Sequence, residues 1–380
     1  MKLRLCDIYE LQMGKTPARN TPEFWNGTNA WVSISDLTSS HKYISQTREH
    51  ITDESITQTG IKKVPKDTLL MSFKLSLGKV AIAGADIYTN EAIMAFLDKK
   101  IHDVYIHFMY HYFQAIDWTI GTNKAVKGVT LNKKTLSEKV IDLPPINIQH
   151  EIAERMDTLN AVTENLQRQL CLLDELVKSQ FVEMFGDPVT NPMGWERARL
   201  ADKCEIVTGN TPSRKVKEYY GNDLEWIKSD NITEATTLTE ATEYLSDEGA
   251  KVGRTVETGS ILMTCIAGSL RSIANVAIVD RKVAFNQQIN AIVPKKQNTY
   301  FMYEQFSLSK DYICSGVNMA LKGILSKGQL SEIEFVFPPL ALQNEFAAFV
   351  EQADKSKFVL ENLAKLLKNY HNEEYQPLGM

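Results

Sequence analysis

The sequence of 380 residues predicts an α+β fold in which two pseudo-symmetric globular domains are separated by two long antiparallel helices forming a coiled coil. Three observations predict this fold. A series of short motifs occurs twice in the same order, each series combines β-rich runs with one aromatic helical stretch, and each is followed by an apolar heptad pattern. We expect the globular domains at residues 1–146 and 188–339, and the helices at 147–187 and 340–380.

The repeat consists of matching motifs about 195 residues apart. Gly-x-Thr-Pro begins at Gly14 and again at Gly209. The other pairs keep their order, and their offset varies only between 192 and 196: Phe24-Trp25 and Tyr219-Tyr220, Trp31 and Trp226, Ser35-Asp36 and Ser229-Asp230, Leu69–Ser72 and Ile261–Thr264, Asn90–Ile93 and Asn286–Ile289, Leu143–Pro145 and Phe337–Pro339. Chance supplies one or two such matches but not an ordered series, so we interpret the chain as a tandem duplication of one module.

Each copy begins with an α+β domain. Short β-rich runs at 68–73 and 260–266 are bounded by Gly, Asn, Pro and Thr residues, and aromatic helical stretches follow at 105–117 and 300–313. A Pro-Pro pair ends each domain, because proline cannot continue a β-ladder and disfavours helix in the preceding residue. We expect turn or core roles for Trp31, Trp226, Gly14, Gly209, Pro144 and Pro338.

A long helix follows each domain. Apolar residues recur at spacings of three and four from Ile152 to Met184, and Gly186-Asp187-Pro188 ends this pattern. A helix of about 35 residues is roughly 50 Å long, and its apolar seam needs a partner. The predicted helix–helix spacer contains Ile152, Leu159, Leu166 and Leu173 in the first helix and Phe346, Ala353, Leu360 and Leu367 in the second. Antiparallel pairing would relate the two copies by an approximate twofold axis.

Charge and cysteine content restrict the class of protein. The net charge is −5, and the acidity lies mainly in the helical segments 147–187 and 340–380, so the globular segments are nearly neutral and can carry basic faces. No signal-like apolar run begins the chain, and the greasiest stretch, 105–120, is too short and polar to cross a bilayer. Five isolated cysteines favour reduced thiols and argue against a metal site. We expect a cytoplasmic protein without membrane contact.

The sequence contains no motif of a catalytic site. Asn191-Pro192-Met193-Gly194 lacks the second proline and the aromatic residue of an adenine methyltransferase motif, and its place after a helix stop favours a turn. Gly78-Lys79-Val80 lacks the further residues of a phosphate-binding loop, and the seven histidines show no triad or metal spacing. The sequence therefore predicts no catalytic residue, no metal and no cofactor in this chain.

The loops do contain the residue types that contact DNA. Base edges are read by Arg, Lys, Asn and Gln, and phosphates are held by Lys, Arg, Ser and Thr. The candidates in the first domain are Thr16, Arg19, Ser35, Ser72, Lys74, Lys79, Lys124 and Lys127. In the second domain they are Thr211, Arg214, Lys215, Lys228, Ser229, Ser269, Arg271, Ser272 and Lys322. Asn90-Glu91 and Asn286-Gln287 either cap a helix or reach DNA, and the sequence leaves both alternatives open.

The stretch Gln180–Pro188, followed by Asn191–Trp195, joins a long helix to a second Gly-x-Thr-Pro domain. Together with the paired Pro-Pro junctions at 143–152 and 337–346, it resembles the specificity subunits of type I restriction-modification systems over essentially the whole chain. The resemblance implies that each globular domain is a target recognition domain for one half of a bipartite site in double-stranded DNA. It also implies that the helices set the spacer and dock two methyltransferase (modification) subunits.

Further partners follow from the same resemblance. Restriction subunits complete the full complex, and S-adenosylmethionine, ATP and Mg²⁺ belong to the partner subunits rather than to this chain. The alternative is a stand-alone sequence-specific DNA-binding or scaffold protein without a modification partner. A self-contained methyltransferase or nuclease is disfavoured by the missing motifs.

Overall fold

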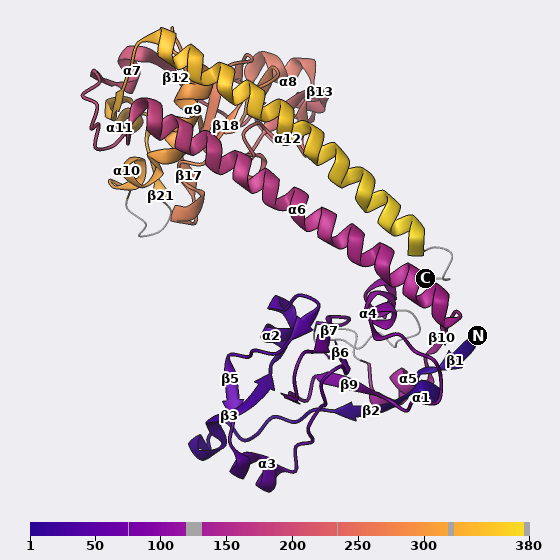
Figure 1. Cartoon of the computed structure of the whole chain (residues 1–380). Helices are drawn as coiled ribbons and strands as arrows, with labels where there is room; N and C mark the ends of the chain where they lie inside the picture. The colour runs from indigo at the N-terminus through magenta and orange to yellow at the C-terminus, as the bar shows by residue number, and fades with distance from the viewer. Residues whose placement is uncertain (75, 119–130, 234, 318–322, 376–380) are drawn as a thin grey trace. The chain divides into compact units, whose positions relative to one another are not determined.

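The computed structural model describes residues 1–74, 76–118, 131–233, 235–317 and 323–375 (Figure 1). The chain forms two units, Met1–Leu166 with Leu363–Met380, and Gln167–Asn362. Both unit boundaries fall inside a long helix, α6 (Ile146–Phe185) or α12 (Leu340–Tyr375). Each unit therefore holds one globular domain and a part of each helix.

The first domain is built on a five-stranded sheet of order β2-β9-β6-β7-β4. Its strands are β2 (Tyr9–Met13), β9 (Ile93–Asp98), β6 (Leu69–Ser72), β7 (Val80–Ala83) and β4 (Tyr43–Ile44). A second sheet contains β5 (Glu49–Ile51), β3 (Trp25–Val32) and β8 (Tyr88–Thr89), and β1 (Lys2–Arg4) pairs with β10 (Val140–Asp142). The helices are α1 (Leu5–Ile8), η1 (Pro22–Phe24), α2 (Ile34–Ser39), α3 (Asp53–Thr59), α4 (Ile106–Ala115) and α5 (Lys133–Glu138).

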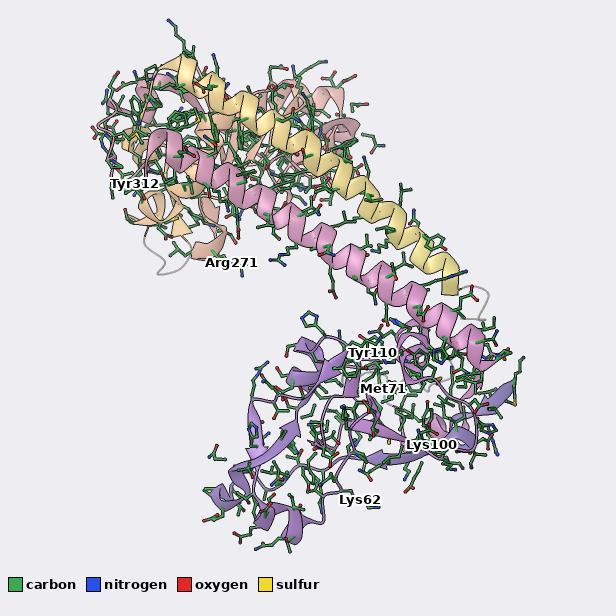
Figure 2. The ribbon with its side chains drawn as sticks, in the orientation of Figure 1. Lys62, Met71, Lys100, Tyr110, Arg271 and Tyr312 are labelled. Carbon is green, nitrogen blue, oxygen red and sulfur yellow. The ribbon has the colours of Figure 1, made fainter. Side chains whose placement is uncertain are left out.

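The core of the first domain lies between the five-stranded sheet and α4. Met71 of β6 is completely buried there (Figure 2). Phe96 of β9 packs edge-on against Phe113 of α4 with ring centroids 4.9 Å apart. Buried residues on β6, β7 and β9 occupy both faces of the sheet, which explains why these strands read as continuous apolar runs. Lys100, just beyond β9, lies on the surface (Figure 2).

The second domain repeats this arrangement. Its four-stranded sheet has the order β12-β20-β16-β18, with β12 (Cys204–Thr208), β20 (Ile289–Pro294), β16 (Ile261–Thr264) and β18 (Val276–Ile278). The other strands are β11 (Arg197–Arg199), β13 (Tyr220–Ile227), β14 (Tyr244–Leu245), β15 (Thr255–Val256), β17 (Ile266–Ala267), β19 (Val283–Phe285), β21 (Gly323–Ile324) and β22 (Glu334–Val336). The helices are α7 (Leu200–Lys203), η2 (Lys217–Tyr219), η3 (Ser229–Asn231), α8 (Asp247–Val252), η4 (Leu270–Ser272), α9 (Thr299–Leu308), α10 (Lys310–Cys314) and α11 (Lys327–Glu332).

The two sheets match strand for strand. β2, β9, β6 and β7 correspond to β12, β20, β16 and β18, with the same neighbours and the same antiparallel pairings. The counterpart of β4 is a single parallel bridge between Thr237 and Ile278. The predicted duplication of an α+β domain is therefore confirmed. The helical stretch predicted at 300–313 consists of two helices, because α9 ends at Leu308 and α10 begins at Lys310.

A buried glutamine joins each domain to its long helix, and it explains the paired Pro-Pro…Gln motifs. The Gln149 amide accepts a hydrogen bond from the Tyr105 backbone N–H (2.8 Å) and donates to the Pro144 carbonyl (2.9 Å). Gln343 repeats the arrangement with the Asn298 N–H (2.9 Å) and the Pro338 carbonyl (2.8 Å). Both glutamines are almost completely buried. The amide satisfies backbone groups that the Pro-Pro segment leaves without a ladder partner.

We expect Gln343→Leu to lower the free energy of unfolding by about 2–3 kcal/mol, because it leaves buried backbone donors and acceptors without partners. Gln149→Leu should have a similar effect on the first domain. Urea unfolding measures the change. Gln167→Leu, at an exposed position of α6, is the matched control and should stay within about 0.5 kcal/mol of the parent. Equal effects at buried and exposed positions would contradict this account.

In the second unit the long helices pack against each other in antiparallel directions. Phe181 of α6 lies 5.4 Å from Phe346 of α12 between ring centroids, and further along the pair the Lys357 ammonium forms an ion pair with Asp174 at 2.6 Å. Along the pair, the residue numbers of α6 decrease while those of α12 increase, so the predicted antiparallel pairing is confirmed in this unit. Gly186, with φ of 75°, ends α6, and its N–H donates to the Val182 carbonyl (2.8 Å).

The predicted spacer residues differ in burial. Leu166, Phe346 and Ala353 are buried, whereas the rest are half-buried: Ile152, Leu159, Leu173, Leu360 and Leu367. Near its start, α6 packs on the first domain through Ala153, which belongs to that domain's core. The apolar seam of α6 therefore packs partly against the other long helix and partly against the globular domain. The heptad pattern does not show which of the two a given position contacts.

Candidate nucleic-acid interface

The C-terminal ends of several strands of the first domain meet at one edge. β2 and β6 both run antiparallel to β9, with Met13 opposite Met94 and Ser72 opposite Ile93, so both end where β9 begins. The end of β3 lies there too, because the Asn90 N–H donates to the Val32 carbonyl (3.1 Å). We call the loops that leave these strand ends, together with Asn90–Ala92, the Asn90 edge.

Most DNA-contact candidates of the first domain lie at the Asn90 edge. Thr16 and Arg19 follow β2, Ser35 follows β3, and Lys74 and Lys79 lie in the connection between β6 and β7. Lys79 is exposed, and the Lys74 ammonium lies 5.1 Å from the ring centroid of Phe73. Lys124 and Lys127 lie outside the described residues. The fold thus gathers candidates from three separate parts of the sequence.

The second domain has the equivalent Asn286 edge, formed by the ends of β12, β13 and β16 with Asn286–Gln288. The Asn286 N–H donates to the Ile227 carbonyl (3.0 Å), and the Cys265 N–H donates to the Gln288 carbonyl (2.8 Å). The candidates lie in the loops that leave these strands: Thr211, Arg214 and Lys215 after β12, Lys228 and Ser229 after β13, and Ser269, Arg271 and Ser272 after β16. Lys322 lies outside the described residues.

The duplicated Gly-x-Thr-Pro motif has a structural explanation. A Cβ atom on Gly14 would lie 2.2 Å from the Asn90 carbonyl oxygen, and one on Gly209 would lie 2.1 Å from that of Asn286. The Trp31 indole donates to the Lys15 carbonyl (3.0 Å), and the Trp226 indole donates to the Asn210 carbonyl (3.3 Å). The predicted scaffold roles of these glycines and tryptophans are confirmed.

An arginine brace accompanies the motif in each domain. The Arg19 guanidinium lies over Trp25, 4.0 Å from the ring centroid, and forms an ion pair with Glu49. Arg214 likewise lies over Tyr220 (4.5 Å) and pairs with Glu243 at 2.6 Å. Hydrogen bonds from Lys228 and Arg214 hold the pKa of the Glu243 carboxyl below its usual range.

Several candidates are therefore already engaged within the protein. The prediction that Ser72 contacts DNA was wrong, because its side chain is completely buried and its hydroxyl donates to the Ser76 carbonyl. The Thr16 hydroxyl donates to the Glu91 carboxylate, and the Thr211 hydroxyl to the Gln287 amide oxygen. Arg19 and Arg214 use their guanidinium groups to hold their loops in place. These residues organise each edge, and the exposed cations beside them remain the stronger candidates.

The sequence left two alternatives for Asn90 and Asn286. Neither caps a helix: the Asn90 carboxamide oxygen accepts from the Ala92 N–H (2.7 Å), and that of Asn286 from the Gln288 N–H (3.0 Å), so both fix a turn at the edge. Arg48 was missed. Its guanidinium donates to the Ser35 hydroxyl (2.8 Å), and its side chain is 66% exposed at the Asn90 edge.

The sequence signal that could have found the brace is the repeat itself. Glu49 and Glu243 are 194 residues apart, which is within the offset of the other motifs, but their neighbours in the sequence differ. The segment Asn191–Gly194 forms a turn as expected, because the Asn191 side chain accepts from the Trp195 N–H (2.9 Å). Among the described residues, no three His, Cys, Asp or Glu side chains gather as a metal site. No described helix is long and apolar enough to cross a membrane.

A charged cluster attaches α6 to the first domain. Asp157 of α6 accepts from the Lys42 ammonium at 2.6 Å and lies 2.7 Å from Nε2 of the buried His111 on α4. Partial burial opposes ionisation of Asp157, but the bonds from Lys42 and His111 outweigh it and lower the pKa of its carboxyl.

We expect Asp157→Asn to lower the free energy of unfolding by about 1 kcal/mol at pH 7, a modest effect because the carboxylate is 42% exposed. A depressed carboxyl pKa stabilises the folded state above the ordinary value of about 3.9, and this stabilisation disappears as the pH falls through the lower folded pKa. The difference between the two proteins in urea unfolding should therefore shrink toward pH 3. Glu164→Gln, which removes an exposed carboxylate from the same helix, is the matched control and should change the free energy of unfolding at pH 7 by less than about 0.5 kcal/mol.

The fold and the two edges define a duplicated protein with two similar globular domains, each presenting polar and basic loops. A family model for the type I restriction modification DNA specificity domain matches residues 1–172 and again residues 192–368. The chain therefore belongs to the family of type I restriction-modification DNA specificity subunits, as the resemblance in its sequence predicted.

Individual relatives agree with this membership. The type I restriction enzyme MjaIX specificity subunit of Methanocaldococcus jannaschii is 24% identical over 377 residues, covering 92% of this chain and 85% of the relative. The HindI specificity subunit of Haemophilus influenzae is 33% identical over 155 residues, covering 39% of this chain and 32% of the relative.

Solved structures share the fold. An S subunit from M. genitalium gives a TM-score of 0.58 at 14% identity, covering 100% of this chain and 95% of that one. A second solved structure, which concerns complex assembly and conformational transition of the type I R-M system, gives a TM-score of 0.64 at 14% identity. The match covers 99% of this chain and 96% of that one.

Proposed function

We propose that this chain is the DNA-specificity subunit of a type I restriction-modification complex and that each domain reads one half of a bipartite site through its edge. The duplicated edge is the observation that carries the proposal. A common scaffold presents unlike loops: Phe73–Ser76 after β6, and Ala267–Ser272 after β16. Two half-sites of different sequence need this combination, because the scaffold sets position and the loops set base choice.

The long helices set the spacer between the half-sites and dock two modification subunits. The exposed apolar surface of α12 supports the docking role: Phe358 is 65% and Val359 63% exposed in the second unit. On α6 of the same unit, Leu172 and Leu176 are also exposed. Apolar side chains that are neighbours on a helix and open to water are typical of a partner-binding surface.

Catalysis belongs to the partners in this proposal. The modification subunits bring S-adenosylmethionine, and restriction subunits bring ATP and Mg²⁺. The chain itself contributes recognition and geometry. It acts in the cytoplasm, where the host DNA lies.

A domain exchange tests the function. Residues 1–143 are replaced by the corresponding domain of another family member, and the methylated sequence is read by long-read sequencing of host DNA. We expect one half of the methylated site to change while the other half and the spacer stay the same. A change in both halves would contradict independent reading by the two domains.

The exposed apolar residues of α12 predict that binding of the modification subunit can be weakened without changing either globular domain. Phe358→Ser with Val359→Ser should weaken binding of the modification subunit by 10-fold or more, because apolar area is lost from the interface. Mass photometry of the mixed subunits measures the complex. Lys365→Ser with Lys368→Ser, at exposed polar positions of α12, is the control, and a loss of similar size there would mean that the surface has no specific role.

A further inference from the structure

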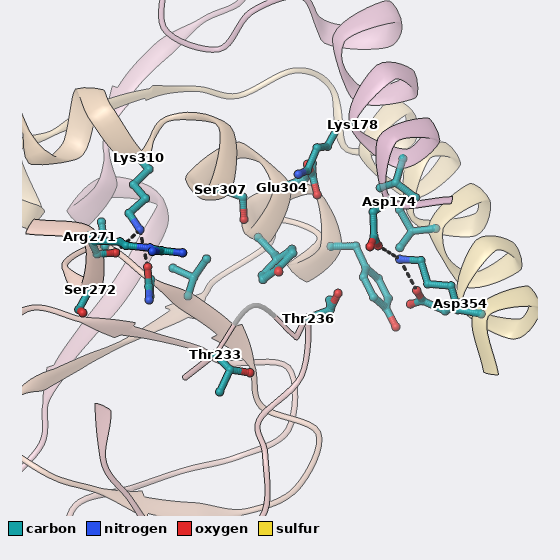
Figure 3. A pocket seen from close by; sticks show the side chains of 18 residues that line it. Asp174, Lys178, Thr233, Thr236, Arg271, Ser272, Glu304, Ser307, Lys310 and Asp354 are labelled. Atoms are coloured by element: carbon teal, nitrogen blue, oxygen red, sulfur yellow. Dashed lines mark hydrogen bonds and ion pairs between the residues drawn. The ribbon is translucent and has the colours of Figure 1, made fainter. Parts of the chain in front are cut away.

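A cavity of about 500 Å³ lies in the second unit where α9, α6 and α12 come together (Figure 3). Tyr303 and Glu304 of α9 and Thr236 line one part of it, and Asp174, Lys178 and Asp354 of the long helices line another. All of these residues belong to the same unit. Arg271 and Ser272 of the Asn286 edge also line the cavity, whereas Tyr303 and Glu304 are not among the DNA-contact candidates.

Glu304 makes this cavity unusual. The residue is only 5% exposed, and its Oε1 atom is buried without a hydrogen-bond partner in the part of the chain that the structure describes. Burial raises the pKa of Glu304 to about 7. A buried carboxyl without a donor is costly, and native proteins usually supply a partner. The carboxyl therefore points to a donor that comes from another molecule.

The first domain shows which donor fits, because backbone bonds fix the equivalent positions. The Ile82 N–H donates to the Lys42 carbonyl (2.8 Å), as the Ile278 N–H does to the Thr236 carbonyl (2.8 Å), so Lys42 corresponds to Thr236. Gln149 and Gln343 accept from the backbone N–H groups of Tyr105 and Asn298. Counting along α4 and α9 from these residues pairs Tyr110 with Tyr303 and His111 with Glu304.

In the first domain this position holds an ammonium group. Lys42 Nζ lies 5.6 Å from the ring centroid of Tyr110 and 2.6 Å from both carboxylate oxygens of Asp157. In the second domain threonine replaces the lysine, the tyrosine is kept, and a carboxyl replaces the histidine. The second domain therefore keeps the aromatic ring and an acidic group but has no ammonium at the position equivalent to Lys42.

We propose that the cavity binds the ammonium group of a primary amine, held by the Glu304 carboxylate and the ring of Tyr303. Carboxylates and tyrosine faces are the groups that bind alkylammonium ions in proteins. The amine is either a free polyamine or a lysine side chain from another subunit. The second source rests on the proposed function, whereas the first depends on this domain alone.

The other charges around the cavity are consistent with this site. Lys357 is neutralised by ion pairs with Asp174 (2.6 Å) and Asp354 (3.6 Å). Lys310 Nζ donates to the Arg271 carbonyl (2.6 Å), and Figure 3 shows both residues away from Glu304. Lys178 also lines the cavity, and its charge, like that of Lys357, acts against the rise in the pKa of Glu304 and would repel a bound ammonium group. We therefore expect Lys178→Gln to tighten amine binding.

Calorimetric titration of the full chain with putrescine and with n-butylammonium chloride tests the site. Saturating amine should raise the thermal midpoint by roughly 2–5 °C. Glu304→Gln should abolish binding; the amide resembles the neutral acid in shape, so this variant should fold. Thr236→Lys should place an ammonium where Lys42 has one, raise the midpoint without ligand and abolish the response. Thr242→Lys, exposed outside the cavity, adds the same charge and should leave binding unchanged.

Binding of the modification subunit distinguishes the two sources. If free amines do not bind, but Glu304→Gln and Thr236→Lys each weaken the complex by 10-fold or more, the ammonium comes from a lysine of that subunit. Equal amine binding by the parent, Glu304→Gln and Thr236→Lys would overturn the proposal. So would the absence of both amine binding and any effect on the complex. The methylated sequence should be unchanged in these variants, so a failed domain exchange would count against the proposed function alone.

Discussion

Gly209→Ala should lower the free energy of unfolding of the second unit by about 3 kcal/mol or more, which is the largest stability effect that we expect from a single methyl group. Its Cβ would lie 2.1 Å from the Asn286 carbonyl oxygen and 2.5 Å from that of Phe285. Both atoms belong to backbone that is fixed by the sheet, so no side-chain rotation relieves the clash. Overpacking of a core usually costs about 1–3 kcal/mol, and a clash with backbone lies at the upper end or above.

Gly268→Ala is the matched control, because a Cβ there meets nothing within 4 Å among the described atoms. It should change the free energy of unfolding by less than about 1 kcal/mol. Urea unfolding followed by circular dichroism measures both variants. Gly14→Ala should repeat the loss in the first unit, since its Cβ would lie 2.2 Å from the Asn90 and Thr89 carbonyl oxygens. A loss below 1 kcal/mol at Gly209 would show that the edge is not rigid.

The repeat in the sequence predicts much of this fold because both copies need the same backbone. Gly209 returns where Gly14 does since only a residue without a side chain lets the strand pass that close to its neighbour. Trp226 occupies the position equivalent to Trp31 because each indole N–H donates to a backbone carbonyl of the Gly-x-Thr-Pro segment. The apolar heptads predict the long helices because a helix that buries one face carries apolar residues at spacings of three and four.

The sites that sequence reasoning missed depend on partners far apart in the chain. The ion pair of Arg214 with Glu243 joins two loops that the fold brings together, and neither residue stands out alone. Ser72 was chosen for its hydroxyl group although it lies inside the predicted β-rich run 68–73, and the structure buries it in β6. The unpartnered Glu304 has no sequence signal at all, because nothing in its helix distinguishes a buried glutamate from an exposed one.

Lys74→Gln with Lys79→Gln should weaken binding of DNA by the complex by roughly 10- to 100-fold at fixed salt. Both side chains lie in the connection from β6 to β7 at the Asn90 edge, and each charge-assisted bond to phosphate contributes about 1.5–3 kcal/mol before compensation. Loss of two phosphate contacts should also reduce the slope of log K against log salt by about 2. Fluorescence anisotropy over a salt series measures both quantities.

Lys66→Gln with Lys100→Gln removes the same charge from the opposite edge of the same sheet. Lys66 precedes β6 and Lys100 follows β9, so both lie where β6 begins and β9 ends. If long-range attraction alone binds DNA, both double variants lose affinity equally, and the Asn90 edge has no special role. If the edge contacts the duplex, only the Lys74 and Lys79 variant loses affinity. Because phosphate contacts carry no sequence information, this variant should methylate the same site more slowly rather than a different one.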